Sequence, residues 1–282
     1  MTHRKTTAGT VRPALLTFLS AVVLLLSFGS ATPALAKGKT AAAKPTVVLV
    51  HGAWADGSSW AGVAKDLQAR GYTVDIPPNP LRGLHFDSAY LKDYLSTIKG
   101  PIVLAGHSYG GAVITDAATG DSQVKALVYV DAFIPAQGQS ILQILTPPKG
   151  SSQPPLNPPA LFNFVPFPGA PKGVADWYLK PTVFMQVLAN GLPKAQAEVL
   201  AVTQRPIASN ALTETSTAPA WKTIPSWDVI GTEDQILPPA LQEAMARTAG
   251  SHITDIKAGH LSGLVEHPAA IAHVISTAAT HS

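Results

Sequence analysis

Short apolar runs alternate with segments of helical spacing along most of this chain, and this pattern limits the folds open to it. The apolar runs lie at residues 46–50, 101–105 and 124–130, and a further strand candidate lies at 72–76. A strand that is apolar along its whole length is buried on both faces, as in a parallel sheet covered by helices on both sides. The sequence therefore predicts an α/β fold with a mostly parallel sheet.

The alternation stops between residues 134 and 222, where 14 of the 25 prolines lie. Apolar and aromatic side chains remain frequent there, whereas a linker would be polar, so the segment is expected to pack as an insertion. Its helix candidates are residues 174–179, 182–190 and 194–204. The sequence predicts a small, proline-rich helical cap.

After the cap the alternation returns, as strand, helix, strand and helix in turn: residues 226–230, 239–249, 252–256 and 268–279. The predicted domain therefore covers residues 46–282, with the cap inserted at about 134–222. Residues 37–45, rich in Ala, Lys, Gly and Thr, are predicted to form a flexible linker before it.

The first 36 residues have the order of a secretory signal peptide. A basic start precedes an apolar stretch at residues 14–28, and the small-x-small site Ala34-Leu35-Ala36 follows. The apolar stretch is shorter than the about 20 residues that a membrane span needs. We therefore expect residues 1–36 to be removed and the protein to be secreted, with an uncleaved membrane anchor as the alternative.

Charge and cysteine content exclude several classes of function. The chain has 20 Lys+Arg and 17 Asp+Glu, and without Arg4, Lys5 and Arg12 of the predicted signal peptide the two totals are equal. A mature chain near neutrality is not expected to bind nucleic acid or an acidic membrane. The absence of cysteine excludes disulfides, thiol nucleophiles and cysteine metal sites. The remaining 246 residues fit one domain with a sizeable core.

Gly106-His107-Ser108-Tyr109-Gly110 matches the pattern G-x-S-x-G, and it lies between a predicted strand and a predicted helix. In this turn the serine is pushed out above the sheet edge, and larger side chains at the two glycine positions would collide. The pattern predicts that Ser108 is a nucleophile; the alternative is an ordinary strand–helix turn.

A serine nucleophile requires a general base and an acid that orients it, and in this kind of fold the acid and then the base follow the serine along the chain. His260, in a loop between the last predicted strand and helix, is the candidate base. Asp234, in the loop after residues 226–230, is the candidate acid. Its neighbour Glu233 is expected to face solvent, whereas Asp131, at an earlier strand end, competes for the same role.

Two backbone N–H groups are expected to stabilise an oxyanion. The Tyr109 N–H lies at the start of a helix, where unpaired donors favour an anion. The second donor is expected in the loop after the first strand, where Gly52 lets the backbone turn. Ala53 is the candidate, with the Trp54 N–H as the alternative, and His51 is expected to hold this loop by hydrogen bonds.

Four pieces of the sequence, VVLVHGAW, GHSYGG, GTEDQILPP and AGH, resemble those of the α/β-hydrolase superfamily and stand in its order. They are similar to its small, cofactor-free esterase branch, which is related to plant methylesterases and hydroxynitrile lyases. The resemblance implies a Ser108–Asp234–His260 triad with an oxyanion hole at Ala53 and Tyr109. Hydroxynitrile lyases of this type carry a lysine after the catalytic histidine, where this chain has Leu261, so cyanohydrin cleavage is not expected.

The expected activity is hydrolysis of carboxylic esters of small to medium apolar substrates through an acyl-enzyme. Two alternatives remain open: a cofactor-free perhydrolase or haloperoxidase with the same triad, and a non-catalytic small-molecule-binding protein. No metal site and no cofactor are expected, since metal and nucleotide motifs are lacking. The sequence gives no oligomeric state. The aromatic side chains expected to contact substrate are Trp54, Phe162, Trp177 and Phe184.

Overall fold

A computed structural model describes residues 44–147 and 156–281. The predicted signal peptide and residues 37–43 of the predicted linker lie outside this range, so both remain predictions. Of the helices within the described residues, none is both long enough and apolar enough to cross a membrane.

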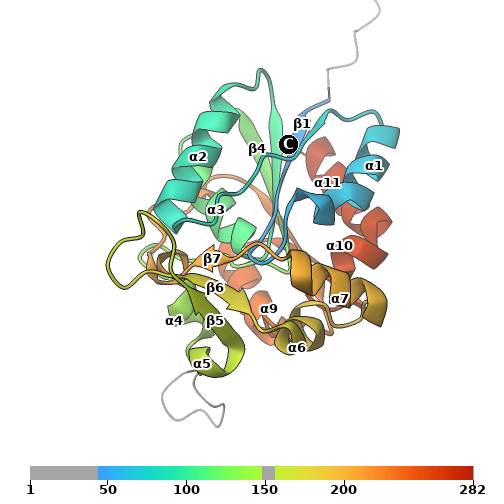
Figure 1. Cartoon of the computed structure of the whole chain (residues 1–282). Helices are drawn as coiled ribbons and strands as arrows, with labels where there is room; N and C mark the ends of the chain where they lie inside the picture. Colours follow the sequence, from blue (N-terminus) through green and yellow to red (C-terminus); the bar gives the residue numbers. More distant parts are fainter. Residues whose placement is uncertain (1–43, 148–155, 282) are drawn as a thin grey trace, which may run out of the picture. The chain divides into compact units, whose positions relative to one another are not determined.

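A six-stranded sheet, parallel throughout, forms the centre of the domain (Figure 1). Its strands, in spatial order, are β2 (Val74–Asp75), β1 (Thr46–Val50), β3 (Ile102–His107), β4 (Val124–Val130), β8 (Ser226–Gly231) and β9 (His252–Ile256). From β1 the chain first adds β2 on one side and then β3 on the other. The connections after β1 and β3 therefore diverge at the carboxyl end of the sheet, which is where ligands bind in open α/β sheets.

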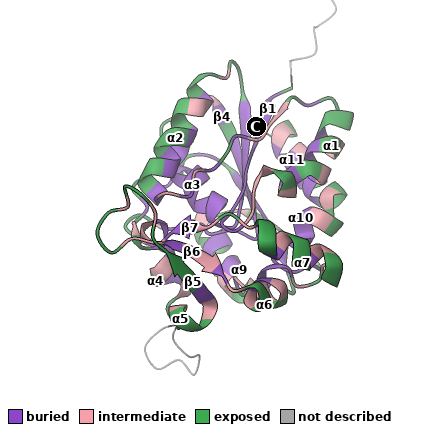
Figure 2. Cartoon of the chain, in the orientation of Figure 1, coloured by how far each residue is buried: buried purple, intermediate pink, exposed green. Residues whose placement is uncertain are grey.

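Helices cover both faces of the sheet, and alternate residues of β1, β3 and β4 contribute to two separate hydrophobic clusters. Val47 and Leu49 of β1 face one cluster, whereas Val48 and Val50 face the other. The first face is covered by α1 (Ala61–Ala69), α10 (Ser262–Glu266) and α11 (Pro268–Thr280); the second is covered by α2 (Leu84–Ser96), α3 (Tyr109–Ala117) and α9 (Pro239–Ala249). The central strands β1, β3, β4 and β8 are buried between these layers, as the apolar runs predict, whereas the edge strands β2 and β9 are partly exposed (Figure 2).

The segment between β4 and β8 carries the short elements of the cap. In chain order they are α4 (Ile141–Leu145), α5 (Pro158–Leu161), β5 (Phe162–Val165), β6 (Asp176–Leu179), α6 (Pro181–Val183), η2 (Phe184–Leu188), α7 (Lys194–Thr203), β7 (Ile207–Ala208), α8 (Asn210–Thr213) and η3 (Ala220–Lys222). The helices expected at 182–190 and 194–204 correspond to α6 with η2 and to α7.

The helix predicted at residues 174–179 is wrong, because this segment contains strand β6. It pairs antiparallel with β5 and β7 in a second, three-stranded sheet, where Trp177 lies opposite both Phe164 and Ile207. Aromatic residues fit such a pleated, half-buried surface. The helical spacing of the apolar residues was therefore less informative than their type, and the cap is a mixed structure rather than a helical one.

Candidate active site

Ser108 lies in the sharp turn between β3 and α3, with φ +53° and ψ −124°. This is a conformation that residues other than glycine rarely adopt. The turn requires glycine at its two flanking positions: a Cβ on Gly106 would lie 2.5 Å from the carbonyl oxygen of Gly110, and a Cβ on Gly110 would lie 2.5 Å from that of Val50. The local sequence therefore allows the backbone to close tightly beneath Ser108, as the G-x-S-x-G pattern predicts.

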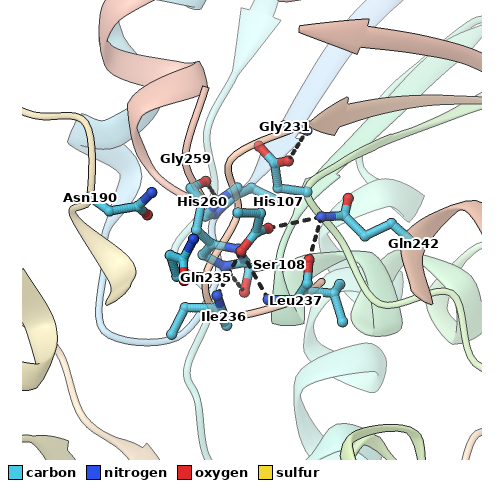
Figure 3. Close-up of polar contacts among 12 residues, drawn as sticks. His107, Ser108, Asn190, Gly231, Gln235, Ile236, Leu237, Gln242, Gly259 and His260 are labelled. Carbon is cyan, nitrogen blue, oxygen red and sulfur yellow. Dashed lines mark hydrogen bonds and ion pairs between the residues drawn. The ribbon is translucent and has the colours of Figure 1, made fainter. Parts of the chain in front are cut away.

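The structure brings Ser108, His260 and Asp234 into one hydrogen-bonded chain. The Nε2 atom of His260 lies 2.8 Å from the Oγ of Ser108 (Figure 3). Its Nδ1 lies 2.7 Å from Oδ2 of Asp234. All three residues are at most 4% exposed. With an ionised Asp234, Nδ1 carries the proton, so Nε2 accepts the hydroxyl hydrogen of Ser108.

The carboxylate of Asp234 is surrounded by hydrogen-bond donors. Its Oδ1 accepts hydrogen bonds from the backbone N–H groups of Ile236 (2.8 Å) and Leu237 (2.9 Å), and its Oδ2 accepts one from Nε2 of Gln242 (2.8 Å). These donors stabilise the ionised form and fix the carboxylate relative to His260. The adjacent Glu233 instead faces solvent, where it pairs with Lys257 at 3.8 Å. Sequence reasoning missed Gln242, which lies on α9, eight positions after Asp234.

Asp131, the competing acid, lies at the carboxyl end of β4, and among the described residues it makes no hydrogen bond or ion pair with His260. Its Oδ1 accepts a 2.6 Å hydrogen bond from the N–H of Gly231, and its Oδ2 has no hydrogen-bond partner among the described residues. Burial, together with the charge of Asp234, raises the pKa of Asp131 well above its ordinary value. The raised pKa favours the protonated form of Asp131, and the geometry favours Asp234 as the partner of His260.

Two other buried histidines support the site as neutral groups. Nε2 of His107 donates to the carbonyl oxygen of His260 (2.9 Å), and burial lowers the pKa of His107 to about 3. Nδ1 of His51 donates to the carbonyl oxygen of Gly52, while its Nε2 accepts from the N–H of Asn79. His51 thus holds the loop after β1 by hydrogen bonds, as expected, and the support that His107 gives to the backbone of His260 was not predicted.

The backbone donors expected at the oxyanion hole fall into two groups. The N–H of Trp54 donates to the carbonyl oxygen of Arg205 at 3.0 Å, so it is occupied. The N–H groups of Ala53 and Tyr109 have no hydrogen-bond partner among the described residues, and both residues line the same cavity as Ser108. The geometry therefore favours Ala53 over Trp54 as the companion of Tyr109.

A cavity of about 260 Å³ adjoins Ser108. Its wall is apolar apart from Ser108, Tyr109 and Gln235. The hydroxyl of Tyr109 is already engaged, because it donates to Asp87 at 2.6 Å. The other lining residues are contributed by the loop after β1, the loop after β4, the loop after β8 and the cap: Ala53, Trp54, Phe133, Ile141, Leu145, Leu156, Leu161, Phe162, Leu179, Val183, Val187, Leu212 and Ile236.

Of the four aromatic side chains expected to contact substrate, only two line this cavity, Trp54 and Phe162. The ring of Trp177 instead packs against Phe162 and Phe164 within the cap. Phe184 is buried and lines a separate, smaller hollow of about 40 Å³. The expectation that Trp177 and Phe184 contact substrate is therefore not supported, because their side chains complete the packing of the cap.

Sequence similarity to known proteins indicates the family of this chain. The model of the alpha/beta hydrolase family matches residues 47–274. A carbendazim hydrolyzing esterase from Nocardioides sp. (strain SG-4G) is 35% identical over 122 residues, which cover 38% of this chain and 50% of that protein. A pyrethroid hydrolase from Sphingobium wenxiniae is 33% identical over 104 residues, which cover 33% of this chain and 37% of that protein. The matches thus span half or less of these curated relatives.

Solved structures agree on the fold. A pyrethroid hydrolase from Sphingobium faniae JZ-2 superposes with a TM-score of 0.65 at 21% identity, covering 84% of this chain and 97% of that one. Polyneuridine aldehyde esterase superposes with a TM-score of 0.67 at 18% identity, covering 83% and 99%. At these identities the likeness concerns the fold alone. Since the family model covers most of the described sheet and its connections, the chain belongs to the alpha/beta hydrolase family.

Proposed function

We propose that this protein is a serine esterase that hydrolyses carboxylic esters through a covalent acyl-enzyme. The observation that carries the proposal is the continuous hydrogen-bonded chain from Asp234 through His260 to Ser108, at 2.7 and 2.8 Å, beside an apolar cavity. A serine hydroxyl is a weak nucleophile unless a base removes its proton as it attacks, and this arrangement supplies that base. The curated relatives named above act on esters or pyrethroids by their names, which supports the same reaction class.

In the proposed acylation, the Oγ of Ser108 attacks the ester carbonyl carbon while Nε2 of His260 takes the hydroxyl proton. The resulting imidazolium is stabilised by the carboxylate of Asp234. The oxyanion accepts hydrogen bonds from the N–H groups of Ala53 and Tyr109, a contribution of roughly 3–4 kcal/mol for a single donor in such sites. His260 then protonates the alcohol oxygen as the carbon–oxygen bond breaks.

In the proposed deacylation, a water molecule attacks the acyl-enzyme carbonyl and loses its proton to Nε2 of His260. The same two N–H groups stabilise the second oxyanion, and the returned proton releases Ser108 with the carboxylic acid product. Because the pKa of His107 is low, His107 stays uncharged and does not oppose the charge that develops on His260. The ester and one water molecule supply all the atoms of the acid and alcohol products, so no cofactor takes part in the proposed reaction.

The cavity supports small to medium, uncharged, apolar ester substrates. Its volume is about 260 Å³, near the lower end of the few hundred cubic ångströms typical of ligand pockets, and no charged side chain lines it. A charged group would lose its hydration there without gaining a partner, which disfavours its binding.

A panel of p-nitrophenyl esters from acetate to palmitate tests this proposal. We expect kcat/KM to be greatest for short to medium acyl chains and to fall by at least roughly tenfold for palmitate, since each 1.4 kcal/mol of lost binding is a factor of ten. A preference for palmitate would contradict the substrate class. Peroxide-dependent turnover with acetate in place of ester hydrolysis would favour the perhydrolase alternative, and ester binding without turnover would favour a non-catalytic binding protein.

We also propose that the protein is secreted and that residues 1–36 are removed on export, on the strength of the basic, apolar and small-residue segments of the sequence alone. N-terminal sequencing of the exported protein tests this. A first residue of Lys37 supports it, whereas an intact Met1 on a membrane-bound protein supports the anchor.

A further inference from the structure

Trp54, which directly follows the proposed oxyanion donor Ala53, has an unusual backbone conformation. Its φ is +57°, in the left-handed region that bulky side chains rarely adopt. Among the described residues other than glycine, a positive φ occurs only at Trp54, Leu81, Ser108 and Asp131. Such a conformation costs conformational energy and persists only where the surroundings hold it.

Three contacts hold Trp54, and all three partners lie in the cap. The Trp54 N–H donates to the carbonyl oxygen of Arg205 at 3.0 Å, between α7 and β7. Its indole Nε1 donates to the carbonyl oxygen of Trp177 on β6 at 2.8 Å. Its ring is stacked on Phe162 of β5, with centroids 5.5 Å apart and an interplanar angle of 24°. Trp54 therefore ties the loop after β1 to three separate segments of the cap.

We propose that Trp54 is a positioning residue: by binding the cap, it holds the Ala53 N–H in the direction of the oxyanion. The inference rests on the proposed function. The Ala53 N–H belongs to the peptide unit between Gly52 and Ala53, so its direction depends on how the loop is held on both sides of Ala53. The cap contacts hold the following residue, Trp54, at a backbone torsion that the tryptophan would not otherwise keep, and so fix the carboxyl side of Ala53. The position of the cap and the formation of the oxyanion hole are thus coupled through the side chain of Trp54.

Trp54 also lines the active-site cavity, and the test must separate this second role from its effect on the Ala53 N–H. Its ring lines both the active-site cavity and the neighbouring hollow of about 40 Å³ that also contacts Phe184 and Leu261. Truncation to alanine would therefore enlarge both spaces and alter substrate binding. A suitable variant keeps an aromatic ring and removes only the indole N–H.

The test compares Trp54→Phe with the matched control Trp221→Phe. The indole Nε1 of Trp221 also donates to a backbone carbonyl, that of Pro135 at 3.1 Å, but Trp221 does not line the active-site cavity. The measurements are kcat and KM for p-nitrophenyl acetate and butanoate. They are complemented by the inhibition constant of a trifluoromethyl ketone, which forms an oxyanion on serine, and that of the methyl ketone of the same shape, which stays unattacked.

For Trp54→Phe we expect kcat to fall roughly 10- to 100-fold for both esters with KM unchanged, since complete loss of one oxyanion donor costs roughly 10²–10³. Inhibition by the trifluoromethyl ketone should weaken by the same factor, while inhibition by the methyl ketone stays constant. Trp221→Phe should change none of these values more than about twofold. If Trp54→Phe does not fold, benzothienylalanine at position 54 replaces it, because sulfur then substitutes for the N–H at nearly constant shape.

A loss confined to KM, a loss that depends on acyl length, or an equal loss in Trp221→Phe would overturn the inference. An unchanged kcat in Trp54→Phe, beside an active wild type, would overturn it while leaving the proposed function intact. A wild type that hydrolyses no ester and shows no preference for the trifluoromethyl ketone would instead contradict the proposed function itself.

Discussion

Replacing Ser108 by alanine is expected to lower kcat for p-nitrophenyl acetate by roughly 10⁶-fold, the size of effect seen when a triad serine is removed. This variant lacks the hydroxyl that accepts the acyl group. The Nε2 atom of His260, which lies 2.8 Å from that hydroxyl in the wild type, then has no proton to take. Stopped-flow and steady-state release of p-nitrophenol measure the effect. KM for the residual reaction should change little, because the apolar cavity remains.

The matched control is Ser96→Ala on α2, where an exposed serine hydroxyl bonds only the carbonyl oxygen of Asp93 in its own helix. Its kcat should equal that of the wild type. If Ser108→Ala keeps more than about one hundredth of the wild-type kcat, a water or another group acts as the nucleophile, and the acyl-enzyme mechanism is wrong.

The second large effect is expected for Asp234→Asn, which should lower kcat roughly 10⁴-fold. An amide oxygen in place of Oδ2 accepts from Nδ1 of His260 but carries no charge to stabilise the imidazolium. An amide nitrogen in that place cannot accept from Nδ1 at all. Asp131→Asn, in contrast, should keep kcat within a few-fold of the wild type. Its amide oxygen still accepts from the N–H of Gly231, and its NH₂ occupies the position of Oδ2, which has no hydrogen-bond partner among the described residues. Reversed results for the two variants would identify Asp131 as the triad acid.

Asp131→Asn should also change the pH dependence of stability. Because the pKa of Asp131 is raised in the folded state, the folded protein keeps a proton that the unfolded chain releases above the ordinary value of 3.8. Asp131 therefore lowers the free energy of unfolding of the wild type by up to about 1.4 kcal/mol for each unit by which the pH rises. In urea unfolding between pH 4 and 7, the variant should gain stability relative to the wild type with rising pH. A constant difference would mean that Asp131 is ionised in the folded protein.

The sequence predicts the centre of the sheet well, because burial on both faces makes the strands there mostly apolar. The run at residues 124–130 corresponds to β4 at both ends, and that at 46–50 to β1. The strand expected at residues 72–76 shortens to β2, Val74–Asp75, at the edge of the sheet, where a strand has one neighbour only. Edge position is a property of the tertiary structure, and local composition does not reveal it.

The positions of Ser108, Asp234 and His260 could be predicted from chain order and turn chemistry, since each follows a strand at the same edge of the sheet. Most of the groups that hold the triad and the loop after β1 could not be predicted. Gln242 reaches Asp234 from α9, and the partners of Trp54 on Arg205 and Trp177 are main-chain carbonyls. Main-chain partners place no restriction on residue type, so they leave no signal in one sequence.

The cap was the least predictable part of the chain. Phe162, Trp177 and Phe184 are all large aromatic residues of one proline-rich segment, yet only Phe162 lines the cavity. Whether such a side chain faces substrate or packs within the cap depends on the register of β5 and β6, which pair Phe162 with Leu179 and Phe164 with Trp177. That register is set by contacts between residues distant in sequence.

The most direct test of the account is labelling of the wild-type protein with a fluorophosphonate, followed by intact-mass and peptide mass spectrometry. The account predicts one added phosphonyl group per chain, on the peptide that contains Ser108, and complete loss of ester hydrolysis in step with labelling. No adduct on Ser108 in a preparation that still hydrolyses esters would contradict it.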